Sequence, residues 1–463
     1  IEMHLRWLQA KPVMFLAAVT TVIAMSGCQS YRPEPLDLDS YHESWKAFSP
    51  TNDNIIAFAE SIFASQPSYR EMVFDPSDGL SLSEGEIVSL VFNPDLRVLR
   101  MRSGIAQATA ENAGRWSDPT FNLNVLKITE SIPDPWFVSS ALSFTIPISG
   151  RLRAEKARAE AALQTQLDRV VEMEWRVRRD LRDAWVSWSA KRLKLEQAQA
   201  IIEQLNLIVE STSLLSKAGE MPETEARLFL IEREARKAER NQLEAGVAED
   251  FQRLKALVGL SPDAPIDPVP SVSSVPEPNE KEVPDNNNPT LSRLRSQYET
   301  AERALITEVR KQYPDLTIGP QAESEEGQSR IGFIGMIPIP ILNANRQGIA
   351  EANAARETAR VVFETEYQRI LGRIAQLRAR LKGIHDQLRT IQDNLAPLVD
   401  RQVTNAHRLL RIGESNSLVL LQSLIRTYEV KIMLIDLQLE NSLTNNEIRF
   451  LLGPTAAHSD PAS

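Results

Sequence analysis

Residues 163–209, LQTQLDRVVEMEWRVRRDLRDAWVSWSAKRLKLEQAQAIIEQLNLIV, decide the fold of this chain. Steps alternating four and three residues meet fourteen positions, twelve of them apolar: Leu163, Leu167, Val170, Glu174, Val177, Leu181, Ala184, Trp188, Lys191, Leu195, Ala198, Ile202, Leu205 and Val209. A 3.5-residue repeat sustained this long is typical of a coiled-coil seam. No proline lies between Pro147 and Pro222. The pattern therefore predicts one helix of about 65 residues, roughly 100 Å long and suited to crossing a distance.

The same periodicity recurs later in the chain. From Phe363 the steps meet only apolar residues: Phe363, Tyr367, Ile370, Ile374, Leu377, Leu381, Ile384, Leu388, Ile391, Leu395 and Leu398. This second seam contains Pro397, which has no amide hydrogen to donate within a helix. We therefore expect a break or kink at Pro397.

Five landmarks recur at offsets of 193 to 195 residues, which indicates an internal duplication. They are Asn-Pro at 93–94 and 288–289, Pro119 and Pro314, Ile-Pro-Ile at 146–148 and 339–341, Gly219 and Gly413, and Leu-Val-Gly at 257–259 with Leu-Leu-Gly at 451–453. The resulting division is a signal peptide (1–27), an N-terminal extended segment (28–78), a first repeat (79–260), a proline-rich linker (261–287), a second repeat (288–453) and a tail (454–463).

Each repeat is predicted to contain a helix, two strands, a very long helix, a turn and a helix. The sequence Ser83–Glu86 has the form of a capping box at the start of the first helix. Apolar and polar residues alternate in four stretches, which predicts strands with one apolar and one polar face: 120–128, 137–147, 316–323 and 330–338. The predicted fold class is mainly α with a small β part.

Four strands are too few to close a barrel, which needs about eight. Apolar outer faces therefore require strands from other chains, and a trimer would supply twelve. The strand lengths suit a tilted membrane crossing. Trp116, Trp136 and Tyr313 flank the strands, as aromatic residues do at membrane interfaces. The alternative is a small soluble sheet that caps a coiled coil.

The N-terminus has the pattern of an export signal. Arg6 and Lys11 precede an uncharged run, Val13–Met25, that is too short to span a bilayer. The run leads into Met25-Ser26-Gly27-Cys28, which resembles a bacterial lipobox and predicts lipidation of Cys28. By the same resemblance, Gln29 implies sorting to the outer membrane. The alternative is a plain signal peptide with an incidental cysteine.

Composition and motifs argue against several function classes. A formal charge of −10 is unsuited to nucleic-acid binding, and one cysteine cannot form an internal disulfide or a cysteine-based zinc site. Hydrolase, metalloprotease and nucleotide-binding signatures are not found in the sequence. We therefore predict no enzyme activity, no metal and no cofactor.

The chain resembles the TolC-type outer-membrane efflux proteins, particularly their lipidated branch. The resemblance rests on Leu80-Ser81-Leu82 followed by Asn93-Pro94, on the duplication, on the two Ile-Pro-Ile motifs and on the glycine turns. It implies a homotrimer with a twelve-stranded barrel in outer-membrane lipid of a Gram-negative-type bacterium and a helical tunnel through the periplasm. It also implies docking on a periplasmic adaptor that connects to an inner-membrane transporter, with passive export. A lipid-anchored coiled-coil scaffold without a pore is the alternative.

The resemblance assigns roles to the two turns between long helices. Gly219 and Glu220 in one turn, with Gly413 and Glu414 in the other, are expected at periplasmic tips that contact the adaptor. The alternative is that the glycines only cap helices. The family's acidic gate corresponds to Val419 and Gln422 here, so that gate is not reproduced.

Other acidic residues lie near the two turns. Glu223, Glu225 and Glu414 suggest a weak cation-attracting ring at the constriction, or else solvated surface charges. The sequence does not indicate the cargo.

Overall fold

The computed structural model describes residues 31–52, 55–59, 74–76, 78–129, 132–133, 135–272, 279, 281–285, 287–325, 328–411 and 417–454. The chain divides into two units between Ala47 and Phe48. In the first unit, helix α2 (Leu38–Lys46) begins at Asp37, whose side chain accepts hydrogen bonds from two backbone amides. All other elements belong to the second unit. No helix within the described residues is both long and apolar enough to cross a membrane.

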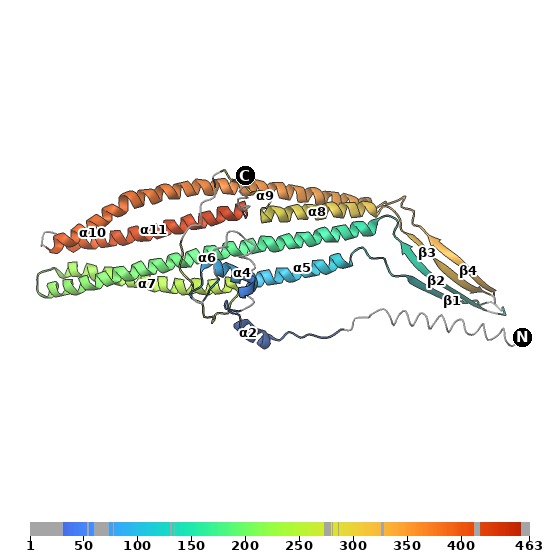
Figure 1. The fold of residues 1–463 in the computed structure, drawn as a ribbon, viewed down its shortest axis with the longest axis horizontal. Coiled ribbons are helices and arrows are strands. Elements are labelled where there is room, and N and C mark those ends of the chain that lie inside the picture. Colours follow the sequence, from blue (N-terminus) through green and yellow to red (C-terminus); the bar gives the residue numbers. More distant parts are fainter. Residues whose placement is uncertain are drawn as a thin grey trace. The chain divides into compact units, whose positions relative to one another are not determined.

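The second unit is mainly helical with one small sheet, as the sequence predicts (Figure 1). Its elements are α4 (Leu82–Phe92), α5 (Pro94–Asn112), β1 (Thr120–Lys127), β2 (Trp136–Ile146), α6 (Arg151–Lys217), α7 (Glu223–Val258), α8 (Pro289–Arg310), β3 (Leu316–Glu325), β4 (Gln328–Met336), α9 (Arg346–Thr390), the π-helical turn η2 (Ile391–Leu395), α10 (Ala396–Arg411) and α11 (Ser417–Leu452). Helix α6 is uninterrupted over 67 residues, about 100 Å.

The long helices lie side by side in a fixed order. Helix α6 contacts α5 and α7 on one side and α8 and α11 on the other, and α9 contacts both α8 and α11. The C-terminal end of α7 meets the start of α5, and the end of α11 meets the start of α8 (Figure 1). Each of these pairs therefore continues one row of helix alongside α6 or α9.

From Val177 to Leu205 the first predicted seam follows the buried stripe of α6, whereas Leu167 near the start of the helix is 43% exposed and its place in the seam is wrong. Val177, Leu181, Ala184 and Trp188 are buried, together with Ala198, Ile202 and Leu205 further along. The two polar positions of the seam are paired: Glu174 with Arg100 at 2.7 Å and Lys191 with Asp250 at 2.8 Å. Ion pairing explains how the seam accommodates charge at these positions.

The interruption expected at Pro397 takes the form of the π-helical turn η2 just before it. A π turn contains more residues than an α turn, so it shifts the phase of the buried stripe. Ile391 is buried as predicted, but Leu398 is 60% exposed and the neighbouring Val399 is buried instead. The prediction of Leu398 in the seam is therefore wrong.

The capping box at the start of the first helix is shifted by two residues from the predicted one. Ser81 caps α4 and exchanges hydrogen bonds with Glu84. The predicted partner Glu86 is buried and pairs with Arg182 of α6 instead. Both Ser81 and Ser83 stand three residues before a glutamate, so the sequence pattern fits either register.

Candidate functional site: sheet, helix ends and a charged pocket

The sheet is open at both edges. Its strands lie in the order β1-β2-β3-β4, all antiparallel, and among the residues that the structure describes no further strand pairs with the outer edge of β1 or β4. Unpaired edges favour pairing with further strands. The single chain therefore leaves two hydrogen-bonding edges available to other chains.

One face of the sheet is apolar and exposed. Register places Val125 opposite Val138, Phe144 opposite Ile318, and Pro320 opposite Phe333. Directly paired residues share a face, so these side chains form one continuous surface. Ile331 and Phe333 are 89% and 87% exposed there. A large exposed apolar surface marks a site of contact with protein or lipid.

The opposite face of the sheet is mostly polar. It carries Asn122, Asn124, Ser139, Ser143, Thr145, Gln321 and Glu323. The predicted alternation of apolar and polar faces is therefore confirmed. Trp116, Trp136 and Tyr313 flank the strands and are all exposed.

The turn between α6 and α7 is capped by glycine. Gly219 has φ +77°, and the amide of Glu220 donates to the carbonyl of Leu215 at 2.9 Å, which is a Schellman motif. A capping role for Gly219 is therefore confirmed, and Glu220 is exposed beside it. Gly413 and Glu414 lie outside the described residues, as does Cys28.

The candidate gate residues fall on two different helices. Glu223 and Glu225 occupy the first turn of α7, while Val419 and Gln422 lie exposed near the start of α11. Glu223 is exposed and pairs with Arg227 at 2.6 Å. Glu225 accepts a hydrogen bond from the Ser417 hydroxyl, which connects α7 to the first residue of α11. The structure thus brings the starts of these two helices together.

The repeated sequence landmarks contact each other at the helix junctions. The Asn93 side chain caps α5 and donates to the Leu257 carbonyl, and Asn288 caps α8 and donates to the Leu451 carbonyl, both at 2.8 Å. Gly259 then turns the chain with φ +90°. A Cβ atom on Gly259 would lie 2.2 Å from the Phe92 carbonyl oxygen, so only glycine fits.

The proline-rich linker crosses one face of the helices, and we call residues 261–272 with 281–285 the strap. Its backbone carbonyls accept hydrogen bonds from four helices: from Trp185 of α6 at 2.9 Å, Lys255 of α7 at 2.8 Å, Arg378 of α9 at 2.7 Å and Ser442 of α11 at 2.9 Å. Ser189 also accepts from the amide of Ser271.

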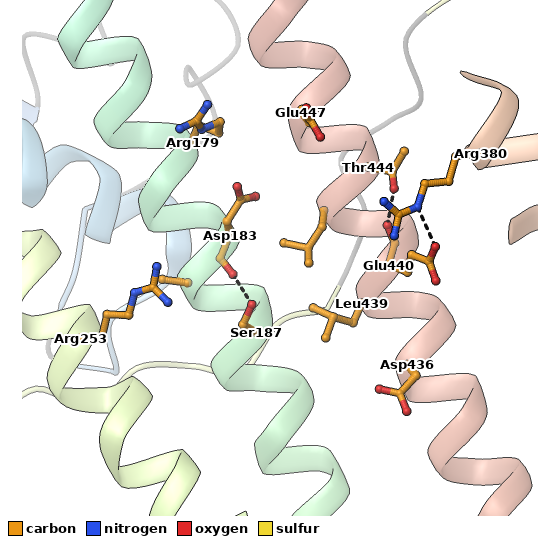
Figure 2. Close-up of a pocket in the computed structure, with 12 residues that line it drawn as sticks. Arg179, Asp183, Ser187, Arg253, Arg380, Asp436, Leu439, Glu440, Thr444 and Glu447 are labelled. Atoms are coloured by element: carbon orange, nitrogen blue, oxygen red, sulfur yellow. Dashed lines mark hydrogen bonds and ion pairs between the residues drawn. The ribbon is translucent and has the colours of Figure 1, made fainter. Parts of the chain in front are cut away.

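A pocket of about 700 Å³ lies between α6, α7, α9 and α11 (Figure 2). Charged residues dominate its lining: Arg179, Asp183, Arg253, Arg380, Asp436, Glu440 and Glu447. Most of them are paired, for example Arg380 with Glu440 at 2.8 Å and Glu447 with Arg373 at 2.7 Å. Asp183 accepts a hydrogen bond from the Asn446 amide at 3.1 Å, and burial raises the pKa of its carboxyl.

No sequence motif marks this pocket. Arg179 and Asp183 belong to the charged stripe of α6 that lines the pocket. The spacing of apolar residues in the sequence predicts only which stripe of each helix is buried. It does not indicate which helices enclose the charged stripe.

The fold is similar to that of solved outer-membrane channels. The outer membrane protein VceC from Vibrio cholerae aligns with a TM-score of 0.66 at 17% identity, over 80% of this chain and 96% of VceC. The Campylobacter jejuni CmeC outer membrane channel aligns with a TM-score of 0.67 at 13% identity, over 92% and 94%. The open state of the Neisseria gonorrhoeae MtrE outer membrane channel aligns with a TM-score of 0.62 at 13% identity, over 82% of this chain and 93% of MtrE. Neither protein-family models nor curated protein sequences gave a match.

This chain therefore has the fold of the TolC-type outer-membrane channel proteins. The alignments cover 80% to 92% of this chain, and the predicted fold class is confirmed.

Proposed function

We propose that this chain is the outer-membrane exit duct of a tripartite efflux or secretion system. Three copies form one channel that exports small molecules or ions passively. The channel couples to a periplasmic adaptor and, through it, to an inner-membrane pump. The observation that carries the proposal is the open sheet with one exposed apolar face and one polar face, attached to a helical unit whose longest helix, α6, is about 100 Å long.

The sheet supports a barrel shared between chains. Strands β2, β3 and β4 have 9 to 11 residues, the length of a tilted membrane strand, and β1 is one residue shorter at 8. With the apolar face toward lipid, the polar face lines a lumen, as in membrane barrels generally. Two open edges per chain allow a closed ring of identical copies without any unpaired strand.

The outermost helices support association of identical copies. Val98, Met101 and Ile105 form an exposed apolar stripe on α5, at a spacing of one helical face. Val361 and Val362 are exposed on α9, at the other end of the helix row. In a ring, α9 of one copy would lie beside α5 of the next and cover both surfaces.

Purified protein in detergent tests the proposal directly. We expect the mass of a trimer by light scattering, and stepwise ion currents after insertion into a planar lipid bilayer. A lipid-anchored coiled-coil scaffold is the competing function. A monomer that stays soluble without its lipid and carries no current would support the scaffold and overturn the duct.

The helix turns are proposed as the adaptor-binding and constricting end of the duct. Glu220 is exposed at one turn, and Glu225 connects α7 to α11. Neutralising Glu225 and Glu414 together should lower the cation preference of the current if these carboxylates form a ring at the constriction. An unchanged preference would leave them as surface charges.

We also propose that Cys28 carries the lipid anchor of the mature protein in the outer membrane. Mass spectrometry of the N-terminal peptide should find a diacylglyceryl group and an acyl chain on Cys28. The variant Cys28→Ser should lack both groups. An unmodified thiol in the wild-type protein would contradict the anchor.

A further inference from the structure

The strap and the charged pocket lie on opposite faces of every helix that they share. Residues that bind the strap stand two positions from residues that line the pocket: Trp185 and Asp183, Ser189 and Ser187, Lys255 and Arg253, Arg378 and Arg380, and Ser442 and Glu440. Two residues are about 200° apart around a helix. On all four helices, α6, α7, α9 and α11, the strap contacts and the pocket lining therefore lie on different faces.

Helix α4 lies on the same face of α6 as the strap. Gly85 of α4 approaches the Trp185 ring, whose indole nitrogen donates to the strap. Leu80 pairs with the strap through hydrogen bonds to Asp267 and Val269. The strap and α4 thus form a second layer over this face, whereas charged side chains, which suit a water-filled lumen, line the pocket on the other face. The layered face must point outward if the helices enclose a lumen.

We propose that the pocket lies in the inner wall of the tunnel and that Asp183 there contacts cations in transit. This inference rests on the proposed duct function, because only a closed ring of helices has an inner wall. A trimer would carry three such carboxylates at the level of the strap, between the sheet and the helix turns.

The charges around the pocket single out Asp183. Glu440 engages Arg380, Asp436 engages Lys194, and Glu447 engages Arg373. Within the described residues Asp183 forms no ion pair, and its one hydrogen bond from another helix comes from the neutral amide of Asn446. Figure 2 shows its carboxylate directed into the space between α6 and α11.

An ionised carboxylate that is partly desolvated and has no ion-pair partner within 4 Å is stabilised by any cation that reaches it. Arg179 is held by Asp180 at 2.6 Å and lies over the Phe450 ring. Arg253 also faces the pocket, from α7. Its positive charge opposes cation entry, so removing it should have the opposite effect to removing the charge of Asp183.

Reversal potentials in a potassium chloride gradient test the role of Asp183. The variant Asp183→Asn keeps an acceptor for Asn446, and its potassium-to-chloride permeability ratio should fall roughly twofold or more. Arg253→Gln should raise the ratio. The matched control is Asp263→Asn, which neutralises an exposed carboxylate of the strap and should leave the ratio unchanged. An unchanged ratio in Asp183→Asn overturns the proposed role.

Thiol labelling tests the orientation separately. A cationic methanethiosulfonate reagent should lower the current of Ser187→Cys, which lines the pocket, but not that of Asp263→Cys on the strap. Mass spectrometry verifies that both variants are labelled, and treated wild-type protein accounts for Cys28. Labelled Ser187→Cys with full current would overturn the inner-wall assignment while the channel itself still conducts. Absence of any current in the wild-type protein would instead contradict the proposed function.

Discussion

The side-chain amide of Asn93 donates a hydrogen bond to the backbone carbonyl of Leu257 at 2.8 Å, across 164 residues of sequence. The same side chain accepts from the amides of Asp95 and Leu96 at the start of α5. One residue therefore satisfies backbone groups at the beginning of one helix and at the end of another. Asn288 repeats the arrangement with Leu451 in the second half of the chain, so the duplicated landmarks mark two copies of one junction.

Changing Asn93 to Asp should separate its two roles, capping α5 and donating to the Leu257 carbonyl. Aspartate caps a helix as well as asparagine does, but it cannot donate to the Leu257 carbonyl and places a carboxylate oxygen against it. We expect a loss of about 1–3 kcal/mol in the free energy of unfolding, measured by denaturant titration in detergent. The control Asn112→Ala removes an exposed bond within α5 and should change stability by about 0.5 kcal/mol or less. Equal stability of Asn93→Asp and wild type would show that the junction bond contributes nothing.

Two glycines with left-handed backbone should respond very differently to alanine. Gly219 has φ +77° and no atom within 4 Å of a Cβ position, so Gly219→Ala should cost about 1–2 kcal/mol. Gly259 has φ +90°, and a Cβ would lie 2.2 Å from the Phe92 carbonyl oxygen. Gly259→Ala must therefore displace α4 from α7, and the yield of folded oligomer on a sizing column should collapse. Similar yields for both variants would contradict the close approach at this junction.

Sequence periodicity predicted the helices and strands well because burial on one face repeats regularly. It failed where a local change of geometry altered that regularity. The π turn at Ile391–Leu395 moves the buried position from Leu398 to Val399, and a seam counted in steps of three and four contains no signal for it. The choice between Ser81 and Ser83 as cap depends on Glu86 reaching Arg182, which is a contact between distant segments.

The pocket is the part of the candidate site that could not be predicted from the sequence. Asp183, Arg253 and Glu440 lie on helices separated by loops and a linker, and their meeting depends on how four helices are arranged. The contacts of the strap could not be predicted from the sequence either, because the helices bind backbone carbonyls of the strap rather than particular side chains. Only the spacing of two residues between Trp185 and Asp183, repeated on the other helices, connects the two features.

A charge on the apolar face of the sheet should prevent membrane insertion, whereas a charge on the polar face should not. Phe333→Arg places a guanidinium where lipid is proposed, at a cost of about 2–4 kcal/mol per chain. Asn124→Arg places the same group on the opposite face of β1, where it would meet water in the lumen. Flotation with liposomes after refolding should recover the Asn124 variant and wild type, and lose the Phe333 variant. Equal flotation of both variants would argue for a soluble sheet.

The pH dependence of stability should have opposite signs at two carboxylates outside the sheet. Burial raises the pKa of Asp183 above 3.8, with opposing contributions from Asn446 and Arg179. The folded state then holds this proton more tightly than the unfolded state does. Wild type should therefore lose stability relative to Asp183→Asn as pH rises from 3.8 through the raised pKa.

Glu308 provides the matched comparison for that titration. Hydrogen bonds from Lys311 and Asn345 lower the pKa of Glu308 below 4.5, so the ionised form stabilises the fold above this pH. Wild type should therefore lose stability relative to Glu308→Gln as pH falls through the lowered pKa, and the difference should be constant above pH 4.5. Thermal unfolding midpoints between pH 3 and 7 measure both differences. If the Asp183 difference followed the Glu308 pattern, the carboxylate of Asp183 would be favourably paired in the assembled protein, and it would not be available to passing cations.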